Sequence, residues 1–261
     1  MKQRLDVLLV SLGLCQSRER AKTLIENGQV LLNGNSAKKS GQSVDETVKI
    51  EIVGTQNPYV SRGGLKLEKA IDAFKLTLKD KVAMDIGAST GGFTHCMLKN
   101  GAKKVYAVDV GKDQLHESLR ADERVLNMEK TNIRNLEADK IEPLDFISVD
   151  VSFISLKLVL PKVYEFLKPK GLAVLLIKPQ FEAGKQHLNK KGVVKDKKVH
   201  LTVVREVTAF ASQLGLGVLN LSFSPIRGPE GNIEYLLLVQ KDAESVGLDL
   251  EKVVLNSHEA L

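Results

Sequence analysis

The sequence has no tryptophan, only two cysteines and no long apolar run. Cys15 and Cys96 are far apart and show neither metal-ligand spacing nor a disulfide framework, so we expect no bound metal and a cytoplasmic location. The longest apolar run, residues 172–177, is far too short to cross a membrane. The first four residues are followed by a brief apolar stretch broken by Asp6, so no signal peptide is evident.

The composition indicates a folded, basic protein. Its 261 residues allow one large domain, or a small one followed by a medium one, and 43% hydrophobic residues are enough for a real core. The formal net charge of +6 favours a polyanionic partner without identifying one. Nothing in the pattern fixes the oligomeric state.

Residues 1–60 read as a small basic α+β module. Leucines at helical spacing from Leu5 predict a first helix, and Ser17 is placed to cap a second one. The turn Asn33-Gly34 predicts a hairpin. Cations in the first turns of the second helix oppose the helix dipole, which suggests an external anion, although a solvated charged face is the simpler alternative.

The order of these residues resembles the S4 RNA-binding domain over nearly its whole length. The matching positions are Arg4-Leu5-Asp6, Ser17-Arg18-Glu19-Arg20-Ala21-Lys22, Ile25, Gly28-Gln29-Val30, Asn33-Gly34 and Val44. That resemblance implies contact with structured RNA, mainly through shape and phosphates, and makes Arg4, Arg18, Arg20 and Lys22 the expected RNA contacts. The polar segment 54–59 is the expected linker to a second domain.

A glycine-rich turn follows the first strand expected in the larger domain. The segment 83–94, Ala-Met-Asp-Ile-Gly-Ala-Ser-Thr-Gly-Gly-Phe-Thr, fits neither the dinucleotide fingerprint nor a phosphate-binding loop, which would need a lysine. Asp85 would repel a phosphate but suits a cation such as the amino group or sulfonium of S-adenosylmethionine (SAM). Asp109 ends the next strand, where it could hold ribose hydroxyls. Expected cofactor contacts are Asp85, Gly87, Ser89, Gly91, Gly92, Phe93 and Asp109; the alternative is an ordinary strand–helix turn with a capping acid.

The rest of the chain alternates apolar strands with helices, which predicts a doubly wound α/β sheet of the type found in SAM-dependent methyltransferases. The last two strands leave no room for a helix and should pair as an antiparallel hairpin at the sheet edge. Strands are expected at residues 82–86, 104–109, 124–128, 145–150, 171–177, 216–223 and 233–240.

Four charged residues stand where apolar segments begin, stop or are interrupted: Lys66, Asp150, Lys178 and Glu234. Lys178 follows four aliphatic residues, and desolvation there would lower the pKa of its ammonium group. A lysine tuned in this way can take the proton of an alcohol that is being methylated. Singly, each residue is better explained as a surface or snorkelling charge; together at one sheet edge, they favour a catalytic site.

In order and context these four residues resemble the Lys-Asp-Lys-Glu tetrad of FtsJ-type RNA ribose 2′-O-methyltransferases. The whole chain, including residues 61–67 (Ser-Arg-Gly-Gly-Leu-Lys-Leu) and 178–185 (Lys-Pro-Gln-Phe-Glu-Ala-Gly-Lys), is similar to the TlyA/hemolysin A family. The resemblance implies SAM-dependent methylation of ribosomal RNA in one or both subunits. It implies that Lys178 is the proton acceptor, that Asp150 and Lys66 orient it and the hydroxyl, and that Glu234 completes the charge network.

Further expectations concern the substrate. Asn132 falls near the position of the family's acidic adenine contact, and its side chain can still bond the adenine amino group. Arg62 and Lys185 are further expected RNA contacts. The lysine-rich segment 184–198 could be a mobile solvated loop or a clamp on the RNA backbone, with Phe181 as the only ring nearby. Residues 61–245 would form the methyltransferase domain, and residues 246–261 a dispensable tail.

Three other functions compete with this one. The chain could methylate a base or a protein, it could be a non-catalytic RNA-binding assembly factor, or it could act on membranes as the hemolysin name suggests. The modified nucleotide is not determined by the sequence.

Overall fold

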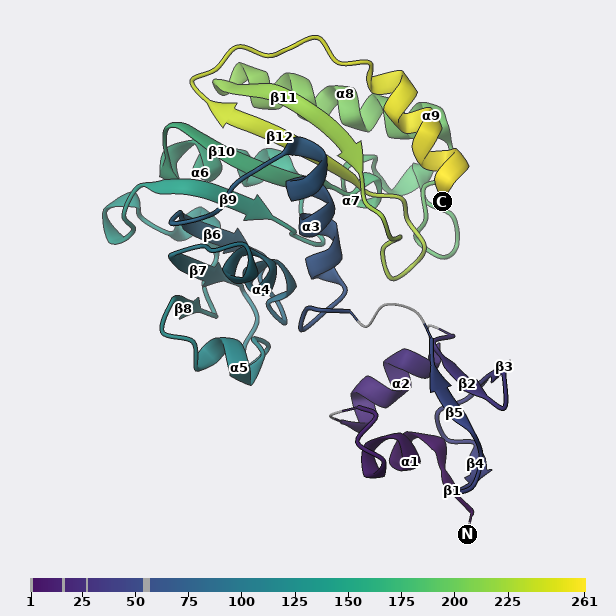
Figure 1. Ribbon diagram of the computed structural model, residues 1–261. Coiled ribbons are helices and arrows are strands. Elements are labelled where there is room, and N and C mark those ends of the chain that lie inside the picture. The colour runs from purple at the N-terminus through teal and green to yellow at the C-terminus, as the bar shows by residue number, and fades with distance from the viewer. Residues whose placement is uncertain (1, 16, 27, 54–56) are drawn as a thin grey trace. The chain divides into compact units, whose positions relative to one another are not determined.

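The chain forms two compact units, residues 1–56 and 57–261 (Figure 1). The computed structural model describes residues 2–15, 17–26, 28–53 and 57–261. Residues 54–56 of the expected linker lie outside this described part. Each unit has its own hydrophobic core, and each is described here by itself.

The first unit packs two helices against short strands. Its elements are β1 (Lys2–Arg4), α1 (Leu5–Ser11), α2 (Arg18–Glu26), β2 (Val30–Leu32), β3 (Asn35–Ser36), β4 (Ser43–Asp45) and β5 (Ile50–Ile52). The strands form a β1–β4 pair and a three-stranded sheet in the order β3-β2-β5. The core draws on both helices and the strands, with Leu5, Leu9 and Ala21 fully buried.

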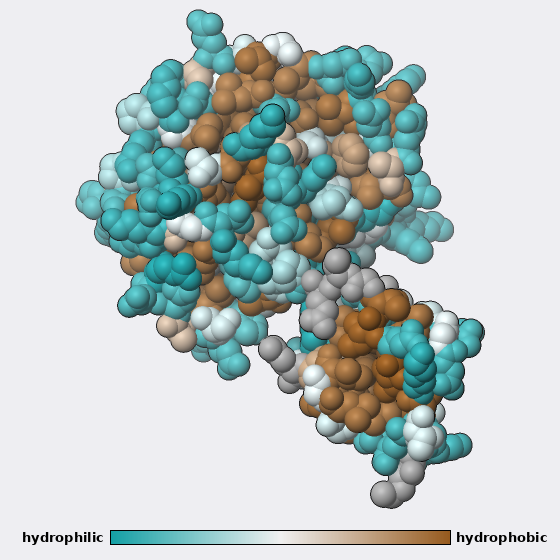
Figure 2. Space-filling model, in the orientation of Figure 1, coloured by the Kyte–Doolittle hydropathy of each residue, from teal (hydrophilic) through white to brown (hydrophobic). Residues whose placement is uncertain are grey.

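Local sequence explains the turns of this unit. The Ser17 hydroxyl accepts a hydrogen bond from the Arg20 amide at 3.2 Å, as expected of a helix cap. Asn33 and Gly34 both have positive φ, 49° and 82°, which is the backbone of a tight hairpin turn between β2 and β3. On the face shown in Figure 2, hydrophobic atoms cover much of this unit, whereas in the second unit they are interspersed with hydrophilic ones.

The second unit is built on a seven-stranded sheet in the order β11-β12-β10-β9-β6-β7-β8. β12 pairs antiparallel with both β10 and β11, and the other neighbouring strands pair in parallel, so the predicted mixed doubly wound sheet is confirmed. β6 (Val82–Ile86) and β11 (Leu216–Phe223) have the expected bounds. The other strands differ from theirs by at most four residues: β7 (Lys104–Val108), β8 (Val125–Met128), β9 (Leu144–Val149), β10 (Leu167–Ile177) and β12 (Tyr235–Lys241).

Helices cover both faces of this sheet (Figure 1). One face packs on α3 (Gly63–Phe74), α4 (Gly92–Lys99) and α5 (Glu117–Arg120), and the other on α6 (Leu160–Phe166), α8 (Lys197–Gln213) and α9 (Leu250–Ala260). Neighbouring residues of β6 point to opposite cores, Met84 to one and Ala83 to the other. The central strands are therefore apolar at most positions, with Asp85 on β6 and Ser148 on β9 as buried polar exceptions. The remaining short helices are α7 (Pro179–Glu182), η1 (Ile133–Asn135), η2 (Ala138–Lys140), η3 (Leu156–Leu158) and η4 (Lys185–His187).

Glu234 differs from expectation in its local structure. It directly precedes β12, which begins at Tyr235, instead of lying inside the strand. Because β12 is antiparallel to β10, its first residue pairs with Ile177 at the carboxyl end of β10. The start of the antiparallel strand therefore brings Glu234 to the same sheet edge as Lys178.

Residues 250–260, which lie in the expected tail, form a helix that packs on the second unit. That the tail is dispensable stays a prediction. Val254 is buried on α9, and the Tyr235 hydroxyl lies 3.1 Å from the hydroxyl of the fully buried Ser257. Tyr235 also lies 2.8 Å from Nδ1 of His200 on α8. Apolar residues at helical spacing along α9 are the sequence signal for this helix. Across the described residues, no helix is long and apolar enough to cross a membrane.

Candidate active site

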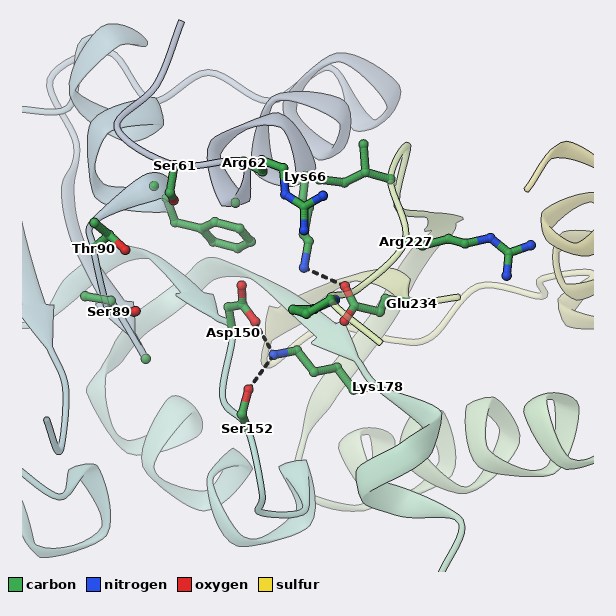
Figure 3. A pocket seen from close by; sticks show the side chains of 17 residues that line it. Ser61, Arg62, Lys66, Ser89, Thr90, Asp150, Ser152, Lys178, Arg227 and Glu234 are labelled. Carbon is green, nitrogen blue, oxygen red and sulfur yellow. Dashed lines mark hydrogen bonds and ion pairs between the residues drawn. The ribbon is translucent and has the colours of Figure 1, made fainter. Parts of the chain in front are cut away.

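A cavity of about 290 Å³ opens at the edge of the sheet where β6, β9 and β10 end and β12 begins (Figure 3). All four residues expected to be catalytic line it, together with Arg62 and part of the glycine turn. The lining residues are Ser61, Arg62, Gly63, Lys66, Gly87, Ala88, Ser89, Thr90, Gly92, Phe93, Asp150, Ser152, Lys178, Ile226, Arg227, Pro229 and Glu234.

Lys178 is held by two oxygen atoms from the segment after β9. Its Nζ lies 2.5 Å from Oδ1 of Asp150 and donates a hydrogen bond to the Ser152 hydroxyl at 3.0 Å. Phe181 lies beside it, with the lysine Nζ 5.9 Å from the ring centroid. The lysine side chain is only 9% exposed, so these contacts fix a charged group that has little access to water.

Lys66 and Glu234 form a second, deeper ion pair. Lys66 projects from α3 and donates to Oε2 of Glu234 at 2.6 Å, and the glutamate is 1% exposed. The loop before β12 closes on this carboxylate at Gly228, where a Cβ atom would lie 2.6 Å from Oε1 of Glu234. The four expected residues are therefore brought together, but as two separate pairs facing one cavity (Figure 3).

The glycine turn is locked to the segment that carries Asp150. Gly87 has φ of 86°, and a Cβ atom there would lie 2.5 Å from the backbone oxygen of Asp150. The Asp150 amide donates to the Ile86 carbonyl at 2.9 Å. Only glycine permits this approach, so Gly87 places the Lys178–Asp150 pair directly beside the turn.

Asp85 lies behind the turn and does not line the cavity. Its carboxylate accepts hydrogen bonds from the amide and hydroxyl of Thr94 at 2.8 and 2.7 Å and from the Ser148 hydroxyl at 3.1 Å. Asp85 is fully buried, and this burial raises the pKa of its carboxyl group to about 7. This bond network joins α4 to the sheet, and direct contact of Asp85 with a cofactor cation stays a prediction.

Asp109 and its neighbours lie beside this cavity without lining it. The Asp109 carboxylate accepts from the amides of Ser89 and Gly111, both at 2.7 Å. The Asp109 backbone carbonyl accepts a hydrogen bond from the Thr131 amide, and this bond brings the next residue, Asn132, close to Asp109. The Asn132 side chain caps η1. Gly91 packs under α5, since a Cβ atom there would overlap Leu119. Asp109, Asn132 and Gly91 therefore surround the turn.

Several residues of the site were missed from the sequence. Ser152 and Arg227 line the cavity. The sequence indicates them only by position, since Ser152 lies two residues after Asp150 and Arg227 lies seven residues before Glu234. Phe153 is 91% exposed with φ of 64°, and its ring centroid lies 5.1 Å from that of Phe181. The expectation that Phe181 is the only ring nearby is wrong.

Three of the basic residues expected to bind RNA, Arg4, Arg18 and Lys22, have acidic partners inside the first unit. Arg4 and Arg18 both bind the buried carboxylate of Asp6, with nitrogen–oxygen distances of 3.0 Å. The two guanidinium groups hold the pKa of Asp6 well below its usual range, the bond from Arg4 being the largest cause. Lys22 lies 3.8 Å from Glu26 on the next turn of α2. These carboxylates balance part of the positive charge, so Arg18 and Lys22 need an external anion less than the sequence suggested.

RNA contact through Arg4, Arg18, Arg20 and Lys22 stays a prediction. Arg62 lies at the cavity, whereas Lys185 is exposed on η4 and does not line it.

Comparison with known proteins gives matches over both units. Residues 59–241 match the family described as FtsJ-like methyltransferase, and residues 3–50 match the S4 domain. The chain is 47% identical, over its full length and 95% of the relative, to YqxC of Bacillus subtilis, which is described as a candidate rRNA methyltransferase. It is 39% identical to the 16S/23S rRNA (cytidine-2′-O)-methyltransferase TlyA of Mycobacterium tuberculosis, over 93% of this chain and 91% of the relative.

A solved structure agrees with the fold. A protein of Streptococcus thermophilus described as a candidate hemolysin superposes with a TM-score of 0.81 at 45% identity, over 99% of this chain and 96% of that one.

Proposed function

The chain belongs to the FtsJ-like methyltransferase family and carries an S4 domain, and from this premise we propose that it transfers a methyl group from SAM to a ribose 2′-hydroxyl of ribosomal RNA. One observation carries the proposal: two lysine–carboxylate pairs face a single cavity beside a glycine turn. This arrangement offers a proton acceptor and fixed charges next to a place for the methyl donor.

The residues around the turn fit SAM. Gly87 and Gly92 bring backbone to the wall of the cavity, since a Cβ atom on either would collide with neighbouring atoms. Asp109 stands at the end of β7, where a carboxylate can accept bonds from ribose hydroxyls. Ser89, Phe93 and Asn132 would complete the contacts. When bound, SAM supplies an electrophilic methyl carbon whose bond to sulfur breaks as the bond to the ribose oxygen forms.

The chain's own residues supply the proton chemistry. Lys178, in its amine form, takes the proton that the 2′-hydroxyl loses as its oxygen is methylated. Asp150 and Ser152 fix the lysine Nζ at the cavity wall, because both bind it at hydrogen-bonding distance. Lys66, fixed by Glu234, orients the hydroxyl with a donated hydrogen bond. After transfer the proton leaves Lys178 to water.

Ribosomal RNA is the proposed substrate for two reasons. The S4 unit matches a domain of RNA-binding proteins, and the relative from Mycobacterium tuberculosis is named for methylating cytidine in 16S and 23S rRNA. We extend the proposal to cytidine in one or both ribosomal subunits and to a cytoplasmic location.

The test combines labelled SAM with purified ribosomal subunits. Label that enters RNA and blocks alkaline cleavage at one linkage is the expected result, because a 2′-O-methyl group prevents attack by that oxygen. Lys178→Ala should lower the rate by about 10²–10⁴-fold, the range for loss of an acid–base group. Full activity of Lys178→Ala would remove the proposed proton acceptor. Label in a base or protein, or no turnover at all, would instead favour one of the competing functions.

A further inference from the structure

A second cavity adjoins the active site and is lined by cations. Its volume is about 470 Å³, and its walls are Asn189, Lys190, Lys191, Val193, Lys195, Arg227, Glu230 and Gly231. Arg227 lines both this cavity and the active site. In Figure 3 the Arg227 side chain extends away from the two ion pairs. Because Arg227 lines both cavities, it connects the two sites.

The loop that carries these lysines has a defined structure. The Asn189 side-chain oxygen accepts from the amides of Lys191 and Val193 at 2.8 and 3.0 Å. The Asn232 side chain, 1% exposed, accepts from the Val194 amide and donates to the Gly192 carbonyl, both at 3.1 Å. Asn232 precedes Glu234 by two residues, so the loop is fixed relative to the catalytic pair.

The charge of this loop is not neutralised within the unit. In the part of the chain that the structure describes, Lys190, Lys191 and Lys195 form no ion pair with a carboxylate. Arg227 donates to the Gly231 carbonyl at 2.9 Å and, through two of its nitrogen atoms, to the main-chain oxygen of Leu261. Glu230 is the only acid among the lining residues. Three lysines and one arginine against one glutamate make a wall that attracts anions.

The start of α8 adds to this positive charge. Asp196 caps the helix by accepting from the Lys198 amide at 2.8 Å, and Lys197 and Lys198 occupy the first turn. Cations in a first turn oppose the helix dipole, which raises the local potential further. Such a concentration of unpaired positive charge is costly unless an anion binds there in the functional state.

Building on the proposed function, we propose that Lys190, Lys191, Lys195 and Arg227 bind the phosphodiester backbone of the ribosomal RNA strand next to the nucleotide being methylated. None of the lining residues is aromatic, so the cavity has no ring on which a base could stack. Flexible ammonium groups bind phosphates as point charges and read no sequence. The site therefore sets the path of the strand into the active site, whatever its sequence.

The test variant changes Lys190, Lys191 and Lys195 to glutamine together. Its matched control changes Lys75, Lys79 and Lys103 to glutamine, which are exposed lysines of the same unit; Lys79 and Lys103 lie ahead of β6 and β7, at the opposite ends of the strands. Binding to 16S and 23S rRNA is measured over a range of salt concentrations, alongside KM for RNA and Kd for SAM. Inorganic phosphate is titrated as a competitor in a separate arm.

The triple loop variant should bind RNA about tenfold more weakly, and its log Kd should depend less steeply on log salt, by about 2 units for three lost phosphate contacts. The Kd for SAM and the properties of the control should equal those of the parent. The inference would be overturned if the two triple variants had the same RNA affinity and the same salt dependence. It would also be overturned if millimolar inorganic phosphate competed strongly with RNA, because that would indicate a site for free anions. Because RNA binding is measured apart from turnover, a parent that binds RNA without methylating it would refute only the proposed function.

Discussion

Lys66 and Glu234 are 168 positions apart in the sequence, yet their side chains form a buried ion pair of 2.6 Å. The pair joins α3, the first helix of the second unit, to the start of its last strand. It is separate from the Lys178–Asp150 pair, so the site contains two ion pairs that can be altered one at a time by mutation.

Lys66→Met should destabilise the second unit by about 3–5 kcal/mol, because Glu234 would be left buried without a partner. The double variant Lys66→Met/Glu234→Gln should recover much of this loss, since no buried charge then remains. Unfolding in urea measures both. If Lys66→Met were as stable as the parent, the Glu234 carboxylate must bind another partner or water in the variant.

Ser152→Ala should slow methyl transfer roughly tenfold through a lower kcat, because Lys178 loses one of its two fixed partners. Ser152→Thr keeps the hydroxyl and should restore most of the rate. Ser212→Ala, which removes an exposed hydroxyl on α8, is the control. The kcat and KM of the three variants separate positioning of Lys178 from RNA binding, since a rise in KM alone would contradict the assigned role.

Gly87→Ala should impair both stability and catalysis. Its positive φ costs roughly 1–2 kcal/mol for any residue with a Cβ, and here the Cβ also meets the Asp150 backbone. Gly231→Ala is the control, because Gly231 also has a positive φ, 94°, but no atom lies near the position of an added Cβ. In urea unfolding this variant should lose only the free energy that the positive φ costs. Displacing Asp150 by about 1 Å can cost 10²-fold in rate. If the two variants were equally stable, the close approach at Gly87 would be unimportant.

The buried carboxyl of Asp85 predicts a pH-dependent stability. Its pKa is about 7 in the folded chain against an ordinary 3.8. Between pH 4 and 7 the unfolded chain therefore binds fewer protons than the folded one, and the free energy of unfolding contributed by Asp85 falls as pH rises, then levels off above pH 7.

Asp85→Asn should remove this pH dependence while preserving the bonds to Thr94 and Ser148. The variant should match the parent near pH 4 and exceed it in stability at pH 8, by at most about 4 kcal/mol for three pKa units. Unfolding of both proteins at several pH values provides the measurement. A stability difference that stays constant with pH would show that Asp85 is ionised in the folded chain throughout.

The sheet was predictable because its strands are short apolar runs that parallel sheets bury on both faces. Asp150, Lys178 and Glu234 were found because each ends or interrupts such a run. Lys66 was chosen over Lys69 only by its family position before Leu67, since spacing could not choose between the two lysines. Side-chain partners were harder to predict: the bond of Arg18 to Asp6 joins residues on two helices, and the burial of Asp85 depends on Thr94 and Ser148. Spacing along a chain contains no information on which of several nearby groups a carboxylate will bind.

The position of β12 has a consequence for the order in which the protein folds. β11 pairs only with β12, and β12 fills the gap beside β10, although it is the last strand to be synthesised. During translation, the edge of β10 stays open and β11 has no place in the sheet until residue 241 has been made. Lys66 likewise cannot form its ion pair until Glu234 has been synthesised. The Lys178–Asp150 pair, at the ends of the paired strands β9 and β10, does not need β12, but the site is completed only when the sheet closes.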